Sequence, residues 1–95
     1  MKNTNYFVYI LTNKTNGVFY TGSSSKLIRR TKEHKRGSGG FTEKYQVDKL
    51  VYFERVANKE EALKRERNIK KWKRSWKVDL IEKNNPRWKD LFEEI

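Results

Sequence analysis

The chain has 95 residues, which suffices for one small domain around a single core, and we take residues 1–95 as that domain. It carries 23 Lys and Arg against 12 Asp and Glu, a net charge of +11, and it has no Cys. The charge predicts a polyanionic partner, and the absence of Cys excludes a disulfide framework and a thiolate zinc site. The longest apolar run, residues 6–11, is far shorter than the roughly 20 residues of a membrane span. We therefore expect a cytoplasmic protein that does not enter membranes.

The first two predicted elements form a β-hairpin. Residues 6–12 are β-branched and aromatic, an Asn-Gly pair supplies the positive φ of a tight turn, and residues 18–22 return antiparallel. Because strand side chains alternate, Tyr9 and Tyr20 should be near neighbours on one face. Such a pair also stabilises a hairpin by up to about 1 kcal/mol without any catalytic role.

A helix over residues 26–36 is predicted next, with N-cap candidates in the three serines before it. It ends at the glycine-rich loop of residues 37–40, which leads to a third strand over residues 49–55. The predicted caps of that first helix are Ser23, Ser24 and Ser25.

The last third of the chain predicts helices. Asn58 should cap one that ends near Trp72, and Ser75 should cap another that reaches Lys83. Asn85, followed by Pro86, predicts the cap of a short terminal helix. The fold class is therefore α+β: a three-stranded antiparallel sheet, made of the hairpin and one strand, flanked by three to four helices.

The positive charge is concentrated in two helical segments. Residues 26–36 carry a net +5 and residues 64–77 a net +7, which leaves −1 for the rest of the chain. A surface that tracks phosphates needs such a concentration, although solvated helix faces produce similar runs.

Polar residues interrupt the apolar stripes of two predicted helices. Ala62, Leu63 and Ile69 define an inward stripe on which Glu66 also falls. A buried carboxylate needs a cation, a metal ion or a strong donor, whereas the alternative is a surface ion pair between Glu66 and Lys70.

The helix over residues 26–36 repeats this pattern. Leu27 anchors a face that also carries Arg30 and His34, one turn apart. Each of these two residues alone fits a solvated surface position. Trp72 and Trp76 lie one turn apart further along the chain, where packing in the core is the favoured interpretation and stacking on exposed bases the alternative.

Together these residues resemble the GIY-YIG nuclease family, and the resemblance covers nearly the whole chain. It is closest to the small stand-alone bacterial branch that is similar to the N-terminal domain of excinuclease C. The first family triplet reads Phe-Val-Tyr here and the second reads Tyr-Thr-Gly, so only the tyrosines and the glycine keep their places. The motifs that carry the resemblance are Phe7-Val8-Tyr9, Tyr20-Thr21-Gly22, Arg30, His34, the segment from Glu61 to Lys70 that contains Glu66, and the segment from Asn85 to Leu91.

The resemblance implies roles for individual residues. Glu66 would hold one divalent ion, Mg²⁺ or Mn²⁺, and Arg30 would contact the scissile phosphate. Tyr9 would be the general base, with its pKa lowered by the positive field, Tyr20 would position water, and His34 would relay the proton or orient the phosphate. The substrate-binding residues would be Gly22, Arg29, Lys70 and Asn85.

The sequence thus predicts a divalent-metal-dependent endonuclease that hydrolyses DNA phosphodiester bonds, a class of activity used in DNA repair. The alternative is a basic module that keeps the fold and binds DNA or structured RNA, such as ribosomal RNA, without turnover. In both cases the partner is a nucleic acid.

Overall fold

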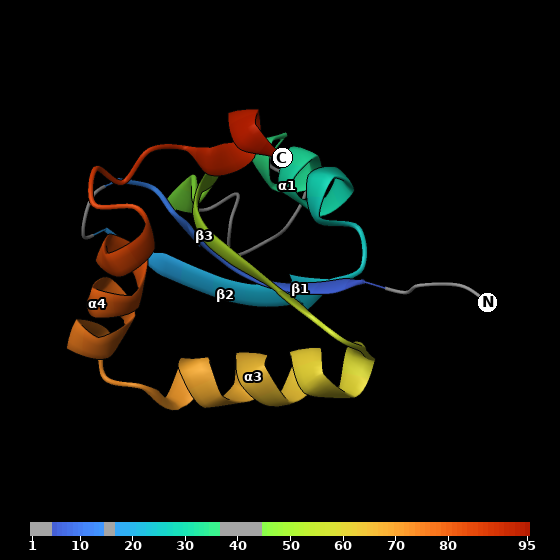
Figure 1. Ribbon diagram of the computed structural model, residues 1–95. Helices are drawn as coiled ribbons and strands as arrows, with labels where there is room; N and C mark the ends of the chain where they lie inside the picture. Colours follow the sequence, from blue (N-terminus) through green and yellow to red (C-terminus); the bar gives the residue numbers. More distant parts are fainter. Residues whose placement is uncertain (1–4, 15–16, 37–44) are drawn as a thin grey trace.

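The computed structural model describes residues 5–14, 17–36 and 45–95. Its three strands form one antiparallel sheet in the order β2-β1-β3, with α3 and α4 on one face and α1 on the other (Figure 1). The predicted α+β class is confirmed, and the glycine-rich loop of residues 37–40 and part of the hairpin turn lie outside the described residues. In chain order the elements are β1 (Tyr6–Thr12), β2 (Phe19–Ser24), α1 (Leu27–Lys35), β3 (Lys49–Val56), α3 (Lys59–Lys71), α4 (Arg74–Asn84) and the 3₁₀ helix η1 (Leu91–Glu94).

The central strand β1 is covered on both faces, which explains its continuous apolar sequence. Val8 and Ile10 pack with α3 and α4, whereas Tyr9 and Leu11 pack toward α1, and all four are at most 1% exposed. No helix among the described residues is long and apolar enough to cross a membrane.

A β-bulge adjusts the pairing of β1 with β3. The register shifts between Ile10 and Leu11, and the consecutive residues Val51 and Tyr52 both pack in the cluster beneath α3 and α4. A bulge inserts one extra residue into a strand, so two consecutive residues can point to the same face of the sheet.

Helix α3 begins at the predicted cap, since the Asn58 side chain accepts a hydrogen bond from the Glu61 backbone N–H at 2.9 Å. Its inward stripe is narrower than the sequence indicates. Ala62 and Ile69 are fully buried, but Leu63 is 41% exposed, so its predicted inward position is wrong. Leu63 lies about 100° around the helix from Ala62, outside the strip that meets the sheet.

Three predicted caps are wrong. Helix α1 begins after Lys26, which makes no side-chain capping bond, and none of the three serines is its N-cap. Ser23 and Ser24 belong to β2, and the Ser24 hydroxyl accepts from the Lys26 N–H at 2.9 Å, ahead of the helix. Helix α4 begins at Arg74 after Lys73, which makes no side-chain capping bond, and not after Ser75. Asn85 caps no terminal helix: η1 starts six residues later, where Asp90 accepts a hydrogen bond from the Phe92 backbone N–H at 3.1 Å.

Asn85 instead holds a turn that follows α4. Its amide donates to the backbone oxygens of Val51 at 3.1 Å and Lys89 at 2.9 Å, and its oxygen accepts from the Lys89 N–H at 3.0 Å. Within this turn Trp88 adopts φ 55°, is 2% exposed and stacks on Phe19 with ring centroids 5.9 Å apart. The turn therefore places the Trp88 indole in the core.

The narrow stripe of α3 yields a stability prediction. We expect Ile69→Ala to lower the free energy of unfolding by about 2–5 kcal/mol, because it removes a fully buried side chain. The control Leu63→Ala removes an exposed side chain of the same size on the same helix and should cost less than about 1 kcal/mol. Urea denaturation followed by circular dichroism measures both, and equal losses would contradict the assignment of the stripe.

Candidate active site

Three aromatic side chains gather on the α1 face of the sheet. The Tyr9 and Tyr20 ring centroids lie 6.4 Å apart, and the His34 ring lies 6.2 Å from Tyr9 and 5.1 Å from Tyr20. The Tyr9 hydroxyl oxygen is 3.4 Å from His34 Nε2. Tyr9 and His34 are buried and Tyr20 is half-buried. The structure thus brings together three of the residues that the sequence singles out.

Gly22 leaves the space that the Tyr9 ring occupies. The two residues are direct partners across β1 and β2, and a Cβ at Gly22 would lie 2.7 Å from the Tyr9 hydroxyl oxygen and 2.9 Å from its Cζ. The phenol therefore lies across the backbone of β2, in space that only glycine leaves open.

Arg30 completes this cluster from α1. Its guanidinium acts on the Tyr9 hydroxyl through a hydrogen bond and through its charge, and its Nη1 pairs with Glu33 Oε1 at 3.0 Å. The Arg30 side chain is 46% exposed, so it joins the buried phenol to the surface.

Glu66 approaches the same stretch of β2 from the opposite face of the sheet. The Ser23 hydroxyl donates to Glu66 Oε1 at 2.5 Å, and Lys70 Nζ lies 2.7 Å from Glu66 Oε2. The Glu66 side chain is 18% exposed and that of Lys70 is 53% exposed. The carboxylate is therefore turned inward, as the helical spacing predicts, and it also makes the alternative ion pair with Lys70.

The two halves of the candidate site meet at the edge strand β2. Gly22 and Ser23 are consecutive residues of the edge strand β2, with Tyr9 against the first and Glu66 against the second. Glu66 lies close enough for its charge to help raise the Tyr9 pKa, although burial is the largest cause. A phenol, a guanidinium and a carboxylate therefore border one short segment of backbone.

The pKa of the Tyr9 phenol is raised, whereas the sequence predicts that it is lowered. Burial, followed by the influence of Tyr20, raises the pKa of Tyr9 to about 12, and Arg30 opposes this shift only in part. The expected lowering of this pKa by the positive field is therefore wrong for the chain by itself, because loss of solvation outweighs one partly exposed cation.

The pKa of His34 shifts in the opposite direction, downward. Burial lowers the pKa of His34, the Arg30 charge lowers it further, and Glu33 raises it in part. Since the unperturbed pKa of His is about 6.5, the His34 imidazole is mainly neutral at pH 7. A neutral imidazole carries one nitrogen that is a hydrogen-bond and proton acceptor.

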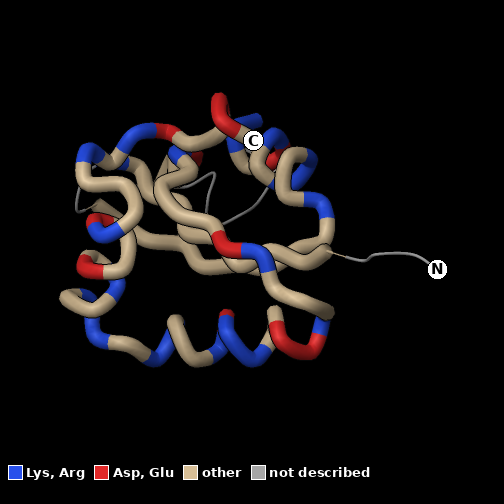
Figure 2. The backbone as a smooth tube through the Cα atoms, viewed as in Figure 1, with Lys and Arg blue, Asp and Glu red and all other residues tan. Residues whose placement is uncertain are grey.

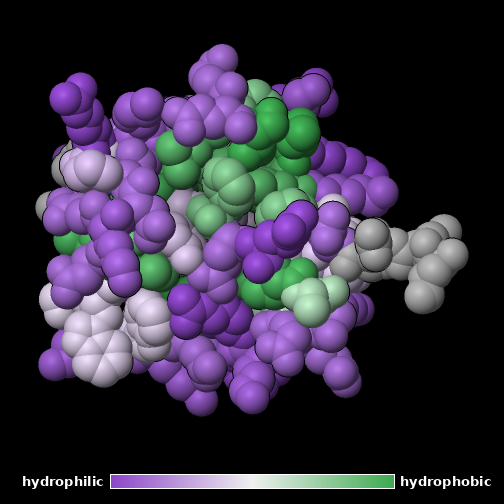
Figure 3. Space-filling view, in the orientation of Figure 1, coloured by the Kyte–Doolittle hydropathy of each residue, from purple (hydrophilic) through white to green (hydrophobic). Residues whose placement is uncertain are grey.

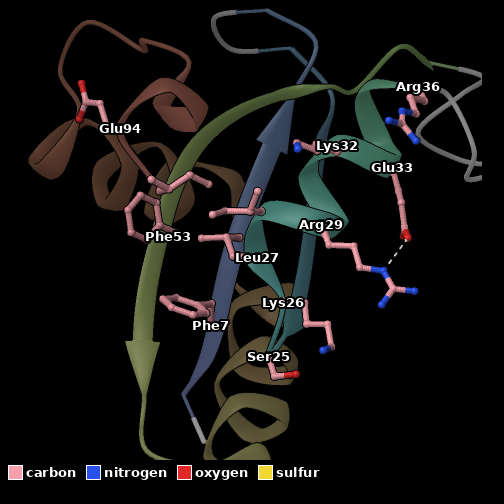
Figure 4. A pocket seen from close by; sticks show the side chains of 12 residues that line it. Phe7, Ser25, Lys26, Leu27, Arg29, Lys32, Glu33, Arg36, Phe53 and Glu94 are labelled. Carbon is pink, nitrogen blue, oxygen red and sulfur yellow. Dashed lines mark hydrogen bonds and ion pairs between the residues drawn. The ribbon is translucent and has the colours of Figure 1, made fainter.

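Arg29 is the predicted substrate-binding residue that the structure separates most clearly from this cluster. It lies at the rim of an apolar groove of about 840 Å³ along α1, where its Nε pairs with Glu33 Oε2 at 3.4 Å (Figure 4). Phe7, Leu27 and Phe53 also line this groove. Arg29 is 69% exposed, so its guanidinium lies at the surface, beside Glu33 and not in the aromatic cluster.

Asn85 also lies apart from the other predicted site residues. It is 4% exposed, and its amide group is used by Val51 and Lys89 in the turn described above. Lys70, by contrast, stands directly at the Glu66 carboxylate.

Ser23 lies in the candidate site, although its sequence context predicts a helix cap. Its hydroxyl contacts Glu66 across 43 residues of sequence. The only available signal was strand alternation, which places residue 23 on the opposite face from Tyr20 and Gly22 once β2 is extended beyond Gly22.

The donor set around Glu66 is small. Within the described ranges no group of three or more His, Cys, Asp and Glu residues could hold a metal ion. One carboxylate oxygen pair and the Ser23 hydroxyl are hard oxygen donors, and they suit an ion that keeps most of its waters, as Mg²⁺ does.

Comparisons with known proteins agree with the residue pattern. The model of the family described as "GIY-YIG catalytic domain" matches residues 5–79. A UPF0213 protein of Clostridium perfringens is 40% identical over 94% of this chain and 96% of its own length, and one of Staphylococcus aureus is 40% identical over 80% and 93%. The solution structure of a UPF0213 protein from Bacillus halodurans is 31% identical, covers 90% of this chain and 92% of its own, and has a TM-score of 0.54.

The single histidine permits a direct test of the site's electrostatics. We expect His34 to titrate below 6.5 in NMR spectra of its ring protons. Arg30→Gln should raise this pKa and Glu33→Gln should lower it, because the two charges act on His34 with opposite sign.

The native state binds fewer protons than the unfolded chain near pH 6, so stability should fall as the pH drops below about 6.5 and through the native pKa. Parallel shifts in the two variants would contradict this arrangement.

Gly22→Ala tests the close approach of the Tyr9 ring. The added methyl has no space beside the hydroxyl and Cζ atoms, so we expect unfolding to become easier by about 1–3 kcal/mol. Ser25→Ala, at an exposed position after β2, is the control and should change stability by less than about 0.5 kcal/mol. Thermal denaturation compares the two, and an unchanged midpoint for Gly22→Ala would show that the ring has room to move.

Proposed function

The chain belongs to the GIY-YIG family, and we propose that it is a divalent-metal-dependent endonuclease that hydrolyses phosphodiester bonds in DNA. The observation that carries the proposal is the edge of β2, where Gly22 and Ser23 hold Tyr9 and Glu66 from opposite faces. Phosphodiester hydrolysis needs an activated water, charge neutralisation at phosphorus and help for the leaving oxygen. This group of side chains meets the first two needs directly.

Glu66 is the residue that would hold the ion. Its carboxylate is fixed by Ser23 and balanced by Lys70, and single-carboxylate binding with water and phosphate oxygens is typical of Mg²⁺ and is also suited to Mn²⁺. A divalent ion bound there supplies Lewis-acid stabilisation of the phosphate and of the departing oxygen.

Arg30 would bind the scissile phosphate. Its guanidinium is half-exposed and lies beside the Tyr9 hydroxyl, and its planar fork suits two phosphate oxygens. Glu33, which now pairs with Arg30, would give up this contact when the phosphate arrives.

Tyr9 and His34 would move the proton together. With a pKa of about 12, Tyr9 carries too little phenolate at pH 7 to act as a free base. In the proposed step the attacking water gives its proton to the Tyr9 hydroxyl oxygen while the Tyr9 proton passes to His34 Nε2, 3.4 Å away. The neutral state of His34 favours this transfer, and Tyr20, beside both rings, would position the water.

The basic surfaces support a nucleic-acid substrate. Lys and Arg follow α3 and its junction with α4 (Figure 2), so substrate phosphates would find several cations beyond Arg30. Contacts of this kind give binding that weakens steeply with salt and discriminates poorly between sequences. Lys70, beside Glu66, would contact a phosphate adjacent to the cleaved one.

A second candidate is a DNA- or RNA-binding module without turnover. It is favoured by one contact, the ion pair of Glu66 with Lys70, since a carboxylate already neutralised in this way has a structural role without any ion.

Glu66→Gln separates the two candidates. We expect it to lower cleavage of plasmid and branched DNA in Mg²⁺ or Mn²⁺ by at least about 100-fold, a loss typical of removing one group that stabilises the transition state. DNA affinity should stay equal or rise, because a negative charge leaves a basic surface. The measurements are gel-based cleavage and fluorescence anisotropy, with EDTA abolishing the wild-type activity.

Glu61→Gln is the matched control, because it removes an exposed carboxylate from the same helix and should leave cleavage unchanged within about twofold. Cleavage by Glu66→Gln at the wild-type rate would refute the proposed metal ligand. Tight binding by a wild-type chain that cleaves nothing under any metal condition would establish the binding module instead.

A further inference from the structure

Trp76 is the most exposed of the large apolar side chains within the described ranges, with 52% of its surface accessible. The favoured sequence interpretation, packing in the core, is correct for Trp72, which packs against the cluster beneath α3 and α4. It is wrong for Trp76. At the corner where these helices meet, side chains of intermediate hydropathy lie among hydrophilic ones (Figure 3). The indole is therefore accessible to a ligand in solution.

Two neighbouring side chains contact the Trp76 indole. Trp72 meets it edge to face, with ring centroids 6.0 Å apart and planes at 75°, and Lys73 Nζ lies 5.7 Å from its centroid. A ring with such contacts loses little further conformational entropy when a planar ligand stacks on it.

The surroundings of Trp76 are strongly basic. Among the residues that the structure describes, no carboxylate forms an ion pair with Lys71, Lys73, Arg74 or Lys77. Burial and the nearby Arg74 charge lower the pKa of Lys77. A surface whose cations form no ion pair within the described part of the chain complements a polyanion rather than an apolar protein partner.

This corner adjoins the candidate active site along β2. The Arg74 guanidinium carbon lies 4.2 Å from the centroid of Phe19, the first residue of β2, and Ser23 against Glu66 is four residues further along that strand. Four strand residues span about 13 Å, which corresponds to about four nucleotides of a stacked strand at ~3.4 Å each. One nucleic-acid strand can therefore reach both places.

We propose that Trp76 stacks on an unpaired base of the substrate strand while Lys73, Arg74 and Lys77 contact its flanking phosphates. The inference rests on the proposed function and narrows its substrate to nucleic acid that is single-stranded within a few nucleotides of the scissile bond. Bases within a duplex hide their faces in the stack, whereas an unpaired base presents a face to an aromatic ring.

Fluorescence titration with a ten-nucleotide oligothymidine, and separately with a blunt DNA hairpin of equal phosphate count, tests the proposal. We expect the single strand to quench the tryptophan emission of the intact chain, and Trp76→Phe to remove most of this quenching. Trp76→Ala should weaken single-strand binding about tenfold and hairpin binding less than twofold. Trp76→Phe should restore most of the affinity, because phenylalanine also offers a ring face.

Two further measurements separate stacking from other causes. The slope of log affinity against log salt should be unchanged in Trp76→Ala and smaller by about 1.4 in the double variant Lys73→Ala and Lys77→Ala, which loses two phosphate contacts. Leu63→Ala, another exposed apolar residue near the same face of the sheet, is the matched control and should leave both affinities unchanged. An oligoribouridine of equal length, used in parallel, distinguishes RNA from DNA as the source of the strand.

Equal weakening of single-strand and hairpin binding in Trp76→Ala would overturn the inference, as would unchanged binding or a change in oligomeric state on gel filtration. The proposed function fails separately. Trp76-dependent binding by a wild-type chain that cleaves nothing would keep the stacking site and refute the nuclease. Cleavage that depends on Glu66 but is unchanged by Trp76→Ala on every substrate would keep the nuclease and refute the stacking site.

Discussion

The hydrogen bond from Ser23 to the Glu66 carboxylate is the contact on which the candidate site depends. A carboxylate that is only 18% exposed loses much of its hydration, and this loss is tolerated only with strong partners. Ser23 at 2.5 Å and Lys70 at 2.7 Å provide them. Because Ser23 belongs to β2 and Glu66 to α3, the same bond fixes the helix against the edge strand of the sheet. The charge is thereby held where the sheet face carrying Tyr9 ends.

Strand alternation explains how two faces of one sheet contribute to one site. Gly22 and Ser23 are neighbours on β2 and point to opposite faces, so the residues that contact them are separated by little more than the backbone of the strand. At a central strand one ligand could not reach both faces, because a further strand fills the space beside the backbone. At the edge strand β2, and with no side chain on Gly22 to keep the Tyr9 ring away, the hydroxyl and the carboxylate can both approach one ligand.

The sequence predicted local features well and contacts between distant segments poorly. The Asn58 cap and the pairing of Tyr9 with Tyr20 depend on short-range geometry, and both are present. The Asn85–Pro86 signal failed because the Asn85 amide bonds Val51, which lies 34 residues earlier in the chain, and no local rule includes that partner. Ser23 was mistaken for a cap for the same reason. The prediction for Leu63 failed because helical spacing shows which side of α3 faces the sheet but not how wide the buried strip is. The width depends on the surface beneath the helix, which the sequence does not give.

The opposed shifts of Tyr9 and His34 tie the fold to the proposed chemistry. Burial favours the neutral form of both groups, which raises the pKa of the phenol and lowers that of the imidazole. Neither residue alone therefore suits base catalysis at neutral pH: the phenol holds its proton too tightly, and the lowered pKa of the imidazole makes it a weak proton acceptor. In contact at 3.4 Å, however, a phenol that donates and a neutral imidazole that accepts can transfer one proton while a second arrives from water. The Arg30 charge strengthens the acidity of Tyr9 and weakens the basicity of His34 at once, so the arrangement resists protonation of His34 until the negative charge of a bound phosphate offsets the guanidinium.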